Sequence, residues 1–342
     1  MSPLSLAVGF LPVLLLLGGL LAADSFKLVT RRQVLVAILW GAGAAAVSFV
    51  LNRLLLDPIG VPPVFLRRYL APLIEETLKA APIFSLIAAS RVGFLVDAAL
   101  LGLASGTGFA LVENAWYAHA LGDTNPWLWV VRGLGTAVLH ASTTALAAIV
   151  AKALLDRAPR QRARAWLLAL APSIAMHSAY NHLAVNPFIA TIVLVVGMPL
   201  ALVSAFEWSE RSTREWLGTG LDRDAELLDL VHSGAIVHSP AGEYLSSLRT
   251  RFDGPVVADM LCLLEIRLEL AMRAKGLLLA REAGLEVPPE KEVIANLEEM
   301  RYLERAIGPV GRLAMHPLLP EGRERWQIRL LEGRGTGSGK RS

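Results

Sequence analysis

Long apolar stretches alternate with short polar ones along the first 206 residues of the chain. Each stretch is close to the roughly 20 residues that an α-helix needs to cross the hydrocarbon core of a bilayer. The pattern therefore predicts an all-α fold, a polytopic transmembrane helical bundle of about seven spans. These spans are expected at about residues 4–22, 33–53, 70–90, 94–120, 127–153, 165–186 and 188–206.

The pattern changes at "EWSERSTREW" (207–216), after which charged residues recur every few positions. Apolar residues follow at helical spacing in 255–283 and 289–307, which predicts a C-terminal soluble helical domain. The last residues, "EGRGTGSGKRS", are of a composition that is typical of disorder. We therefore divide the chain into a transmembrane domain at 1–206, a soluble domain at 207–330 and a disordered tail at 331–342.

Composition supports a membrane protein, since 54% of the residues are hydrophobic and 18% are charged, with a mean hydropathy of +0.50. Soluble domains carry about 25% charged residues. The net charge is +3, but the basic residues lie between apolar runs and no nucleic-acid-binding motif is present, so we expect no nucleic acid partner. The single cysteine, Cys262, excludes an internal disulfide and a cysteine-based metal cage.

The basic loops predict the orientation of the chain. "KLVTRR" (27–32) and "DRAPRQRAR" (156–164) fall on the same side of a seven-span bundle, and basic loops face the cytoplasm. The N-terminus is then outside and the C-terminal domain is cytoplasmic. Arg67 and Arg68 do not fit this rule, since they fall outside, where they either snorkel to the interface or belong to a short amphipathic helix. The first apolar stretch lacks the positive segment of a secretion signal, so we interpret it as a retained transmembrane helix.

Small residues recur within the spans, in "GAGAAA" (41–46) and "GLASGTG" (102–108). Gly102 and Gly106 are four residues apart and share a helix face. Small side chains on one face let helices approach closely in lipid. We interpret these stretches as packing surfaces.

Ionisable groups occur inside the predicted spans, where each costs about 3 kcal/mol even on mild insertion scales. "APLIEETLKAAPIF" (71–84) carries Glu75, Glu76 and Lys79. Three further spans contribute polar groups: Glu113 and Asn114 in "GFALVENAWY", His140 in "TAVLHASTTAL", and His177 and Asn181 in "SIAMHSAYNHL".

The spacing of these groups places one polar stripe on each of four successive helices. Residues four apart share a helix face. The pairs are Glu75 and Lys79, Phe109 and Glu113, His140 and Thr144, and His177 and Asn181. We predict that the four stripes converge on one buried site.

Two chemistries suit such a site. A carboxylate can act as general base on water, while a neutral imidazole or an amide donates to a developing oxyanion, as amide hydrolysis requires. Carboxylates and imidazoles also bind a divalent metal such as zinc, which lowers the pKa of its bound water. The HExxH motif of zinc proteases is absent, and the spacing leaves both mechanisms open.

Three short motifs carry a family resemblance. "EETLK" (75–79) matches EExxK, "FALVEN" (109–114) matches FxxxEN, and "HSAYN" (177–181) matches HxxxN. In this order, over about residues 65–205, the chain resembles the PrsW family of intramembrane proteases. That family is related to CAAX-processing and bacteriocin-processing membrane proteases.

The resemblance implies a catalytic set: Glu75, Glu76, Glu113, His140, His177 and Asn181. In it, Glu75 or Glu76 activates the attacking water, and Glu113 holds water or a metal where CAAX-type relatives carry a histidine. His177 and Asn181 stabilise the oxyanion or bind the metal, and His140 completes the cluster. A metal-dependent mechanism would use Glu76, Glu113, His140 and His177 as ligands. Lys79 neutralises the glutamate pair, and Asn114 and Phe109 support the site.

The expected function is that of an intramembrane endopeptidase, glutamic or metallo in type, which cleaves a membrane-anchored substrate such as an anti-sigma-factor-like regulator. A proton- or ion-coupled transporter also needs buried carboxylates and histidines, but we find no inverted repeat. The third hypothesis is a catalytically inactive membrane scaffold, in which the cytoplasmic helical domain is the functional part. The sequence leaves the substrate, the cleavage site and the oligomeric state open.

Overall fold

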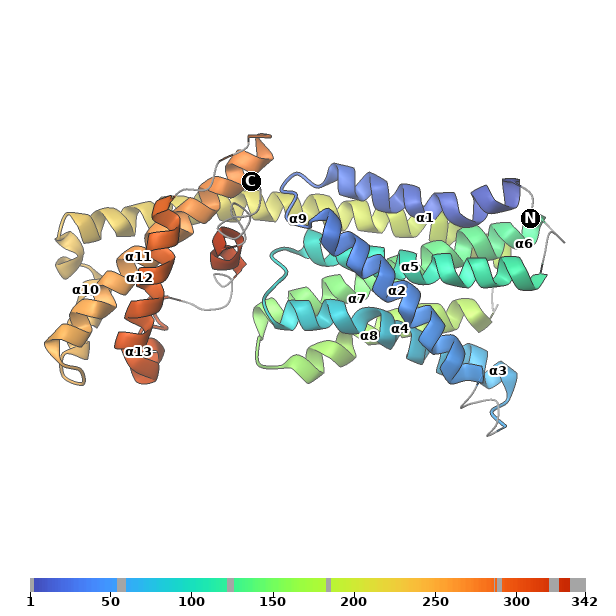
Figure 1. Cartoon of the computed structure of the whole chain (residues 1–342), viewed down its shortest axis with the longest axis horizontal. Coiled ribbons are helices and arrows are strands. Elements are labelled where there is room, and N and C mark those ends of the chain that lie inside the picture. Colours follow the sequence, from blue (N-terminus) through green and yellow to red (C-terminus); the bar gives the residue numbers. More distant parts are fainter. Residues whose placement is uncertain are drawn as a thin grey trace, which may run out of the picture. The chain divides into compact units, whose positions relative to one another are not determined.

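The computed structural model describes residues 3–53, 60–121, 126–182, 186–285, 287, 291–319 and 326–332. These residues form helices and connecting turns, with no β-strand among them, which confirms the predicted all-α class. The chain divides into two compact units, Met1–Glu210 (unit 1) and Arg211–Ser342 (unit 2). The helices of both units are labelled in Figure 1.

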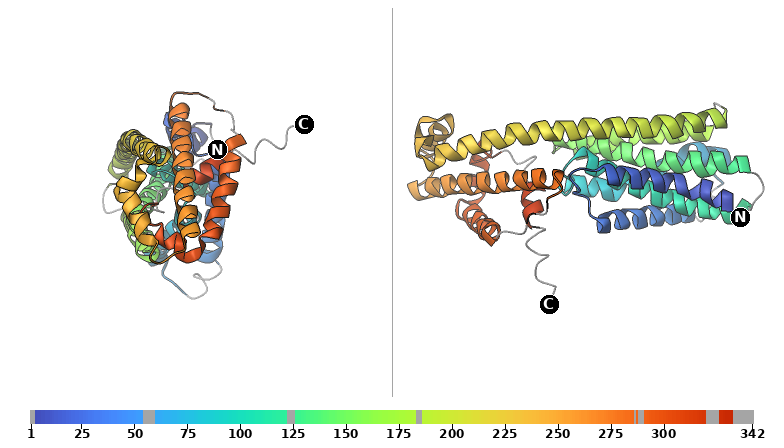
Figure 2. Two further views of the ribbon diagram at one scale, coloured as in Figure 1. Left: turned by 90° about the vertical axis from the view of Figure 1, so that its left-hand side faces the viewer. Right: turned by 90° about the horizontal axis from the view of Figure 1, so that it is seen from above.

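Unit 1 is a bundle of long helices that lie alongside one another (Figures 1 and 2). Two π-helical turns, η2 (Leu66–Leu70) and η3 (Val130–Thr136), lead directly into α4 and α7. The short helices α3 (Pro63–Phe65) and α6 (Pro126–Trp129) precede these turns. The long helices are α1 (Pro3–Ala23), α2 (Arg31–Leu51), α4 (Ala71–Ala88), α5 (Leu95–Leu121), α7 (Ala137–Arg157), α8 (Arg162–His182) and the first part of α9 (Pro187–His232).

The seven predicted spans coincide with α1, α2, α4, α5, the continuous segment of α6, η3 and α7, α8, and the first part of α9. Residues 183–185 of the sixth span lie outside the described residues. Within the described residues, four helices are long and apolar enough to cross a membrane: Arg31–Leu51, Leu95–Ala120, Val130–Arg157 and Pro187–His232. The helix α4 has 18 residues and contains three charged side chains, which lowers its hydropathy. That all seven helices cross the bilayer, and with the N-terminus outside, remains a prediction.

Local sequence explains where these helices begin and how they pack. Thr30 caps α2 by accepting a hydrogen bond from the amide of Gln33, and the Gln33 side chain accepts from the amide of Thr30. Prolines inside helices, such as Pro82 in α4 and Pro172 in α8, are tolerated in membrane bundles, where neighbouring groups satisfy the freed backbone.

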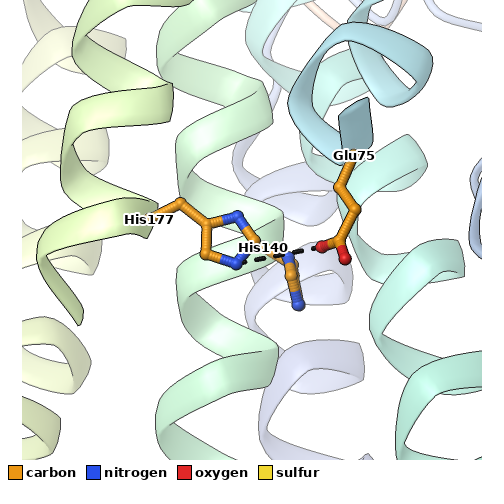
Figure 3. Close-up of side chains that lie close together, drawn as sticks. All are labelled: Glu75, His140 and His177. Atoms are coloured by element: carbon orange, nitrogen blue, oxygen red, sulfur yellow. Dashed lines mark ion pairs between the residues drawn. The ribbon is translucent and has the colours of Figure 1, made fainter. Parts of the chain in front are cut away.

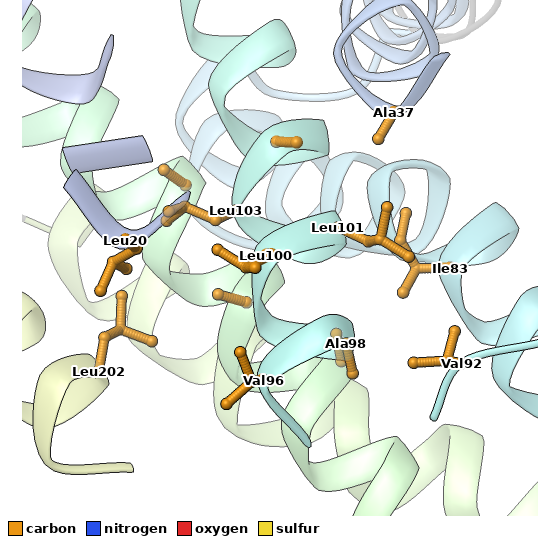
Figure 4. Close-up of a cluster of buried hydrophobic side chains, with 14 of the residues drawn as sticks. Leu20, Ala37, Ile83, Val92, Val96, Ala98, Leu100, Leu101, Leu103 and Leu202 are labelled. Carbon is orange, nitrogen blue, oxygen red and sulfur yellow. The ribbon is translucent and has the colours of Figure 1, made fainter. Parts of the chain in front are cut away.

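The helix α5 lies at the centre of unit 1, and its buried leucines pack against α1, α4 and α9 (Figure 4). Its glycines allow close contact with α7. A Cβ on Gly102 would lie 2.6 Å from the carbonyl oxygen of Thr144, and one on Gly106 would lie 2.5 Å from the Cα of Ala141. Because backbone atoms cannot move aside, glycine is required at both positions, as the small-residue pattern predicts.

Unit 2 consists of the rest of α9, η4 (Ala235–His238), α10 (Pro240–Leu248), α11 (Gly254–Glu282), α12 (Lys291–Ala306), α13 (Gly308–Ala314) and a helical segment at 326–332. The helices predicted at 255–283 and 289–307 are confirmed as α11 and α12. Met260 and Leu264 are fully buried in its core. That this unit is a soluble cytoplasmic domain remains a prediction. Residues 333–342 of the predicted tail lie outside the described residues, whereas residues 331 and 332 are helical.

Candidate active site

Four helices bring the predicted polar groups together in the interior of unit 1. Glu75 and Glu76 lie on α4, Glu113 on α5, His140 on α7 and His177 on α8. Glu75 and His140 each follow a π-helical turn by one helical turn, and His177 lies near the C-terminal end of α8. The stripes on these four helices therefore meet in space.

At the centre of the cluster, Glu75, His140 and His177 point toward one another (Figure 3). One carboxylate oxygen and one nitrogen from each ring lie within 4.8 Å of one another. The His177 Nε2 atom is 3.8 Å from Glu75 Oε2, and the two imidazole rings meet edge to face with centroids 4.8 Å apart. All three residues are buried, with 9%, 0% and 3% of their surface exposed.

Glu76 binds the other side of His177. Its Oε1 atom accepts a hydrogen bond from His177 Nδ1 at 2.8 Å and one from Lys79 Nζ at 2.6 Å. Because Nδ1 carries the proton of this bond, Nε2 of His177 keeps a lone pair on the side of Glu75. Glu76 and Lys79 are 1% and 0% exposed, so this ion pair is sealed from solvent.

His140 has an equivalent arrangement. Its Nε2 atom is 2.8 Å from Glu113 Oε2, and its Nδ1 atom is 2.9 Å from Lys79 Nζ. Because an ammonium group only donates, Nδ1 accepts and Nε2 donates to Glu113. Each histidine therefore binds a carboxylate through one nitrogen. The other nitrogen of His177 lies on the side of Glu75, and the other nitrogen of His140 accepts from Lys79. The Glu113 side chain is 21% exposed.

Neighbouring side chains support these groups. Phe109 packs on His140 with ring centroids 4.7 Å apart, and Lys79 Nζ lies 4.8 Å from the Phe109 ring centre. Ser105 on α5 donates to the carbonyl of Lys79, which joins α5 to α4. These contacts place Phe109 and Lys79 at the site, where the sequence expects them.

Asn114 lies away from the cluster. Its amide donates to the carbonyl oxygens of Gly9, at 2.7 Å, and Gly133, at 3.3 Å. It therefore joins α5 to α1 and η3 and supports the site only through the packing of these elements. Adjacent residues on a helix point about 100° apart, so Glu113 and Asn114 cannot face the same group.

Asn181 also lies outside the Glu75, His140 and His177 group. Its amide donates to the carbonyl of Arg67 at 3.0 Å, one helical turn beyond His177. Ser178 donates to the carbonyl of Arg68 at 2.6 Å, and His182 Nε2 is 3.1 Å from the Tyr69 hydroxyl. The catalytic role that the motif suggests for Asn181 is therefore not accompanied by contact with the cluster.

The sequence motifs do not predict this contact between α8 and η2, and they leave Arg132 without an assigned role. The guanidinium of Arg132 stacks on the Tyr117 ring at 3.6 Å and lies close enough to interact electrostatically with Glu113. The one signal in the sequence was the density of polar residues in "HSAYNH" at the end of α8.

The donor set suits a divalent metal. The Oε2 atoms of Glu75 and Glu76 are buried and have no hydrogen-bond partner among the described residues, which is unusual for buried carboxylates. One carboxylate and two imidazoles form a known catalytic zinc set, and metal-binding histidines usually bind a carboxylate through the other nitrogen. The ligand group contains Glu75, whereas Glu76 and Glu113, which the sequence suggested as ligands, bind the second nitrogens of the histidines.

These features define an integral membrane protein with a buried carboxylate and imidazole site of the kind used in hydrolysis. A family model described as "PrsW family intramembrane metalloprotease" matches residues 30–205, a little over half of the 342 residues. The chain belongs to this family of intramembrane proteases, as the three motifs indicated. No curated protein and no solved structure gives a significant match.

Proposed function

We propose that the chain is an intramembrane endopeptidase that hydrolyses a peptide bond of a membrane-anchored protein, with Glu75, His140 and His177 holding a divalent metal such as zinc. The observation that carries this proposal is the approach of one donor atom from each of the three residues to within 4.8 Å of the others, inside a membrane bundle. An anti-sigma-factor-like regulator remains the example of a substrate that the family suggests.

The metal, when bound, would lower the pKa of a water molecule and polarise the scissile carbonyl. Glu76 and Glu113 accept hydrogen bonds from the N–H groups of His177 and His140. Nε2 of His177 keeps its lone pair on the side of Glu75, and Nδ1 of His140 accepts from Lys79. Lys79 partly offsets the charge of the three carboxylates and donates to Glu76. For His140 Nδ1 to bind a metal, the Lys79 ammonium must leave its present contact at 2.9 Å.

We assign the general base to Glu113. Glu76 is engaged by two donors and is 1% exposed, whereas the Glu113 side chain is 21% exposed and binds His140 through one oxygen. The second oxygen of Glu113 can take a proton from the attacking water and return it to the leaving amine. This assignment replaces the sequence-based one, which gave the role to Glu75 or Glu76.

The test is a comparison of membrane proteins in cells that express the wild type or a variant. Glu75→Gln, Glu113→Gln and His177→Ala should each abolish the release of fragments from single-span proteins, while the variants still insert. Glu207→Gln, at an exposed site in unit 1, is the matched control and should behave as wild type. Normal fragment release by the first three variants would refute the proposal. A pull-down with Glu75→Gln then traps the uncleaved substrate.

A further inference from the structure

A cavity of about 630 Å³ lies in unit 2, bordered by α11, α12, α13 and the helical segment at 326–332. Sites for small ligands are typically about 300–1,000 Å³. The residues that line it all belong to unit 2, so the cavity is separate from the glutamate and histidine cluster of unit 1. The inference drawn from it does not rest on the proposed protease activity.

The floor of the cavity is aliphatic. Leu263, Met300 and Met315 line it and are 2%, 4% and 2% exposed. Leu313 also lines the cavity but is 70% exposed, which places an apolar side chain at its mouth. No aromatic side chain is among the described lining residues, so the cavity lacks the stacking surface that proteins use for nucleobases. This lining suits an alkyl chain.

The charged part of the lining is strongly basic. It contains four arginines and two glutamates: Arg267, Arg301, Arg312, Arg329, Glu304 and Glu332. Glu304 pairs with Arg267 and Glu332 pairs with Arg301, while Arg312 makes no ion pair within the described residues, so the lining carries excess positive charge. Guanidinium groups bind phosphate and carboxylate through two parallel hydrogen bonds.

Arg267 has a donor that is not satisfied. One of its terminal nitrogens binds Glu304, but its Nε atom is buried and has no hydrogen-bond partner within the described chain. A buried donor of a charged group without a partner is costly. An anionic group in the cavity would lie against the residue that carries this donor and would offset the excess charge of the lining.

We infer that this cavity binds an anionic amphiphile, with its phosphate or carboxylate head among the arginines and its alkyl chain on the Leu263, Met300 and Met315 floor. Two sources have this chemistry: the headgroup of an acidic membrane lipid, and a free alkyl phosphate or fatty acid. A plain anion would leave the apolar floor uncovered, and a neutral amphiphile would leave the charge of Arg312 uncompensated.

The test is calorimetric titration of the full chain in phosphatidylcholine nanodiscs with octyl phosphate, with empty nanodiscs as background. Octyl phosphate should bind saturably, whereas inorganic phosphate and octyl glucoside should not. Arg312→Gln should weaken binding about tenfold, because one charged donor is lost. Arg312 is exposed, so the variant should fold. Arg251→Gln makes the same change at an exposed site away from the cavity and should bind as wild type.

Absence of saturable octyl phosphate binding would overturn the inference. Equal binding of inorganic phosphate, or equal weakening by Arg251→Gln and Arg312→Gln, would do the same. Where binding is found, phosphatidylglycerol in the nanodisc separates the two sources. If phosphatidylglycerol weakens the apparent affinity for octyl phosphate, the lipid occupies the cavity and the natural ligand is a lipid headgroup. If the affinity for octyl phosphate is unchanged, the natural ligand is a free amphiphile.

Discussion

The side-chain amide of Asn181 donates a hydrogen bond to the main-chain carbonyl of Arg67 across 3.0 Å. This contact joins the end of α8 to the π-helical turn η2, which runs directly into α4 and its two glutamates. Ser178 makes a second contact of the same kind, to the carbonyl of Arg68. Since α8 also carries His177, these bonds join the helix of His177 to the turn that leads to Glu75. We propose that Asn181 is a positioning residue.

Asn181→Asp removes the donor with little change in shape, so η2 should loosen and cleavage should fall about 100-fold, as expected for a misplaced catalytic group. Ser178→Ala should act in the same direction, because it removes the second bond to η2. Both variants should keep their metal, which elemental analysis would show.

Asn186→Asp is the control for these variants, since the Asn186 side chain serves as an acceptor, for the amide of Phe188, and an aspartate keeps that role. If Asn181→Asp is inactive while Ser178→Ala is fully active, Asn181 acts on the substrate directly and the positioning role is wrong.

Lys79 gives a prediction about metal binding. Its ammonium lies 2.9 Å from His140 Nδ1 and 2.6 Å from Glu76, in a pocket where it is 0% exposed. Lys79→Met leaves Glu76 without its buried cation, which typically costs about 3–5 kcal/mol, and it frees His140 Nδ1. In the absence of metal, the variant should unfold at a lower temperature than the wild type. Zinc should raise the unfolding temperature of the variant by more than it raises that of the wild type.

Lys152→Met is the matched control, because Lys152 is also a buried lysine and pairs with Asp156 at 2.5 Å on α7. Lys152→Met should lower the unfolding temperature, but zinc should raise that temperature by the same amount as in the wild type. An equal zinc effect in wild type and Lys79→Met would show that the ammonium does not compete for His140.

The contact of α5 with α7 predicts a strong effect at Gly106. An added Cβ would lie 2.5 Å from the Cα of Ala141, next to His140, so Gly106→Ala must separate the two helices. Overpacking of this kind costs about 1–3 kcal/mol, and the shift should also reduce cleavage. Gly43→Ala on α2, where no atom lies within 4 Å of the added Cβ, should be neutral. Equal unfolding temperatures of the two variants in nanodiscs would contradict this packing.

Cys262, the only cysteine, tests the predicted orientation. Its side chain is exposed on unit 2, so a membrane-impermeant maleimide should label it only after the cells are permeabilised. Partial burial and the nearby carboxylates of Glu265, Asp259 and Glu299 raise the pKa of the Cys262 thiol. Labelling depends on the thiolate and should therefore speed up from pH 7 to pH 8.5. Labelling of intact cells would place unit 2 outside, and Cys262→Ser is the blank.

The helices and the residues of the cluster could be predicted because apolar length and the i, i+4 rule are local properties of the chain. The sequence could not predict which of Glu75 and Glu76 joins the donor group and which binds the second nitrogen of His177. Adjacent residues point about 100° apart on a helix, and the histidines that they meet lie on α7 and α8. Asn181 shares the His177 face but lies one turn further along, where it meets η2. The π-helical turns that precede α4 and α7 have no recognisable sequence signal, so this contact was not foreseeable.

The most direct test of the account is the metal content of the full chain, purified in nanodiscs and measured by elemental analysis. Wild type should hold one equivalent of a divalent metal. Glu75→Gln and His177→Ala should lose it, and Glu76→Gln should bind it about 10- to 100-fold more weakly, as expected when the carboxylate behind a metal-binding histidine is removed. Chelation should stop cleavage and added metal should restore it. A metal-free wild type that cleaves normally in chelator would contradict the account.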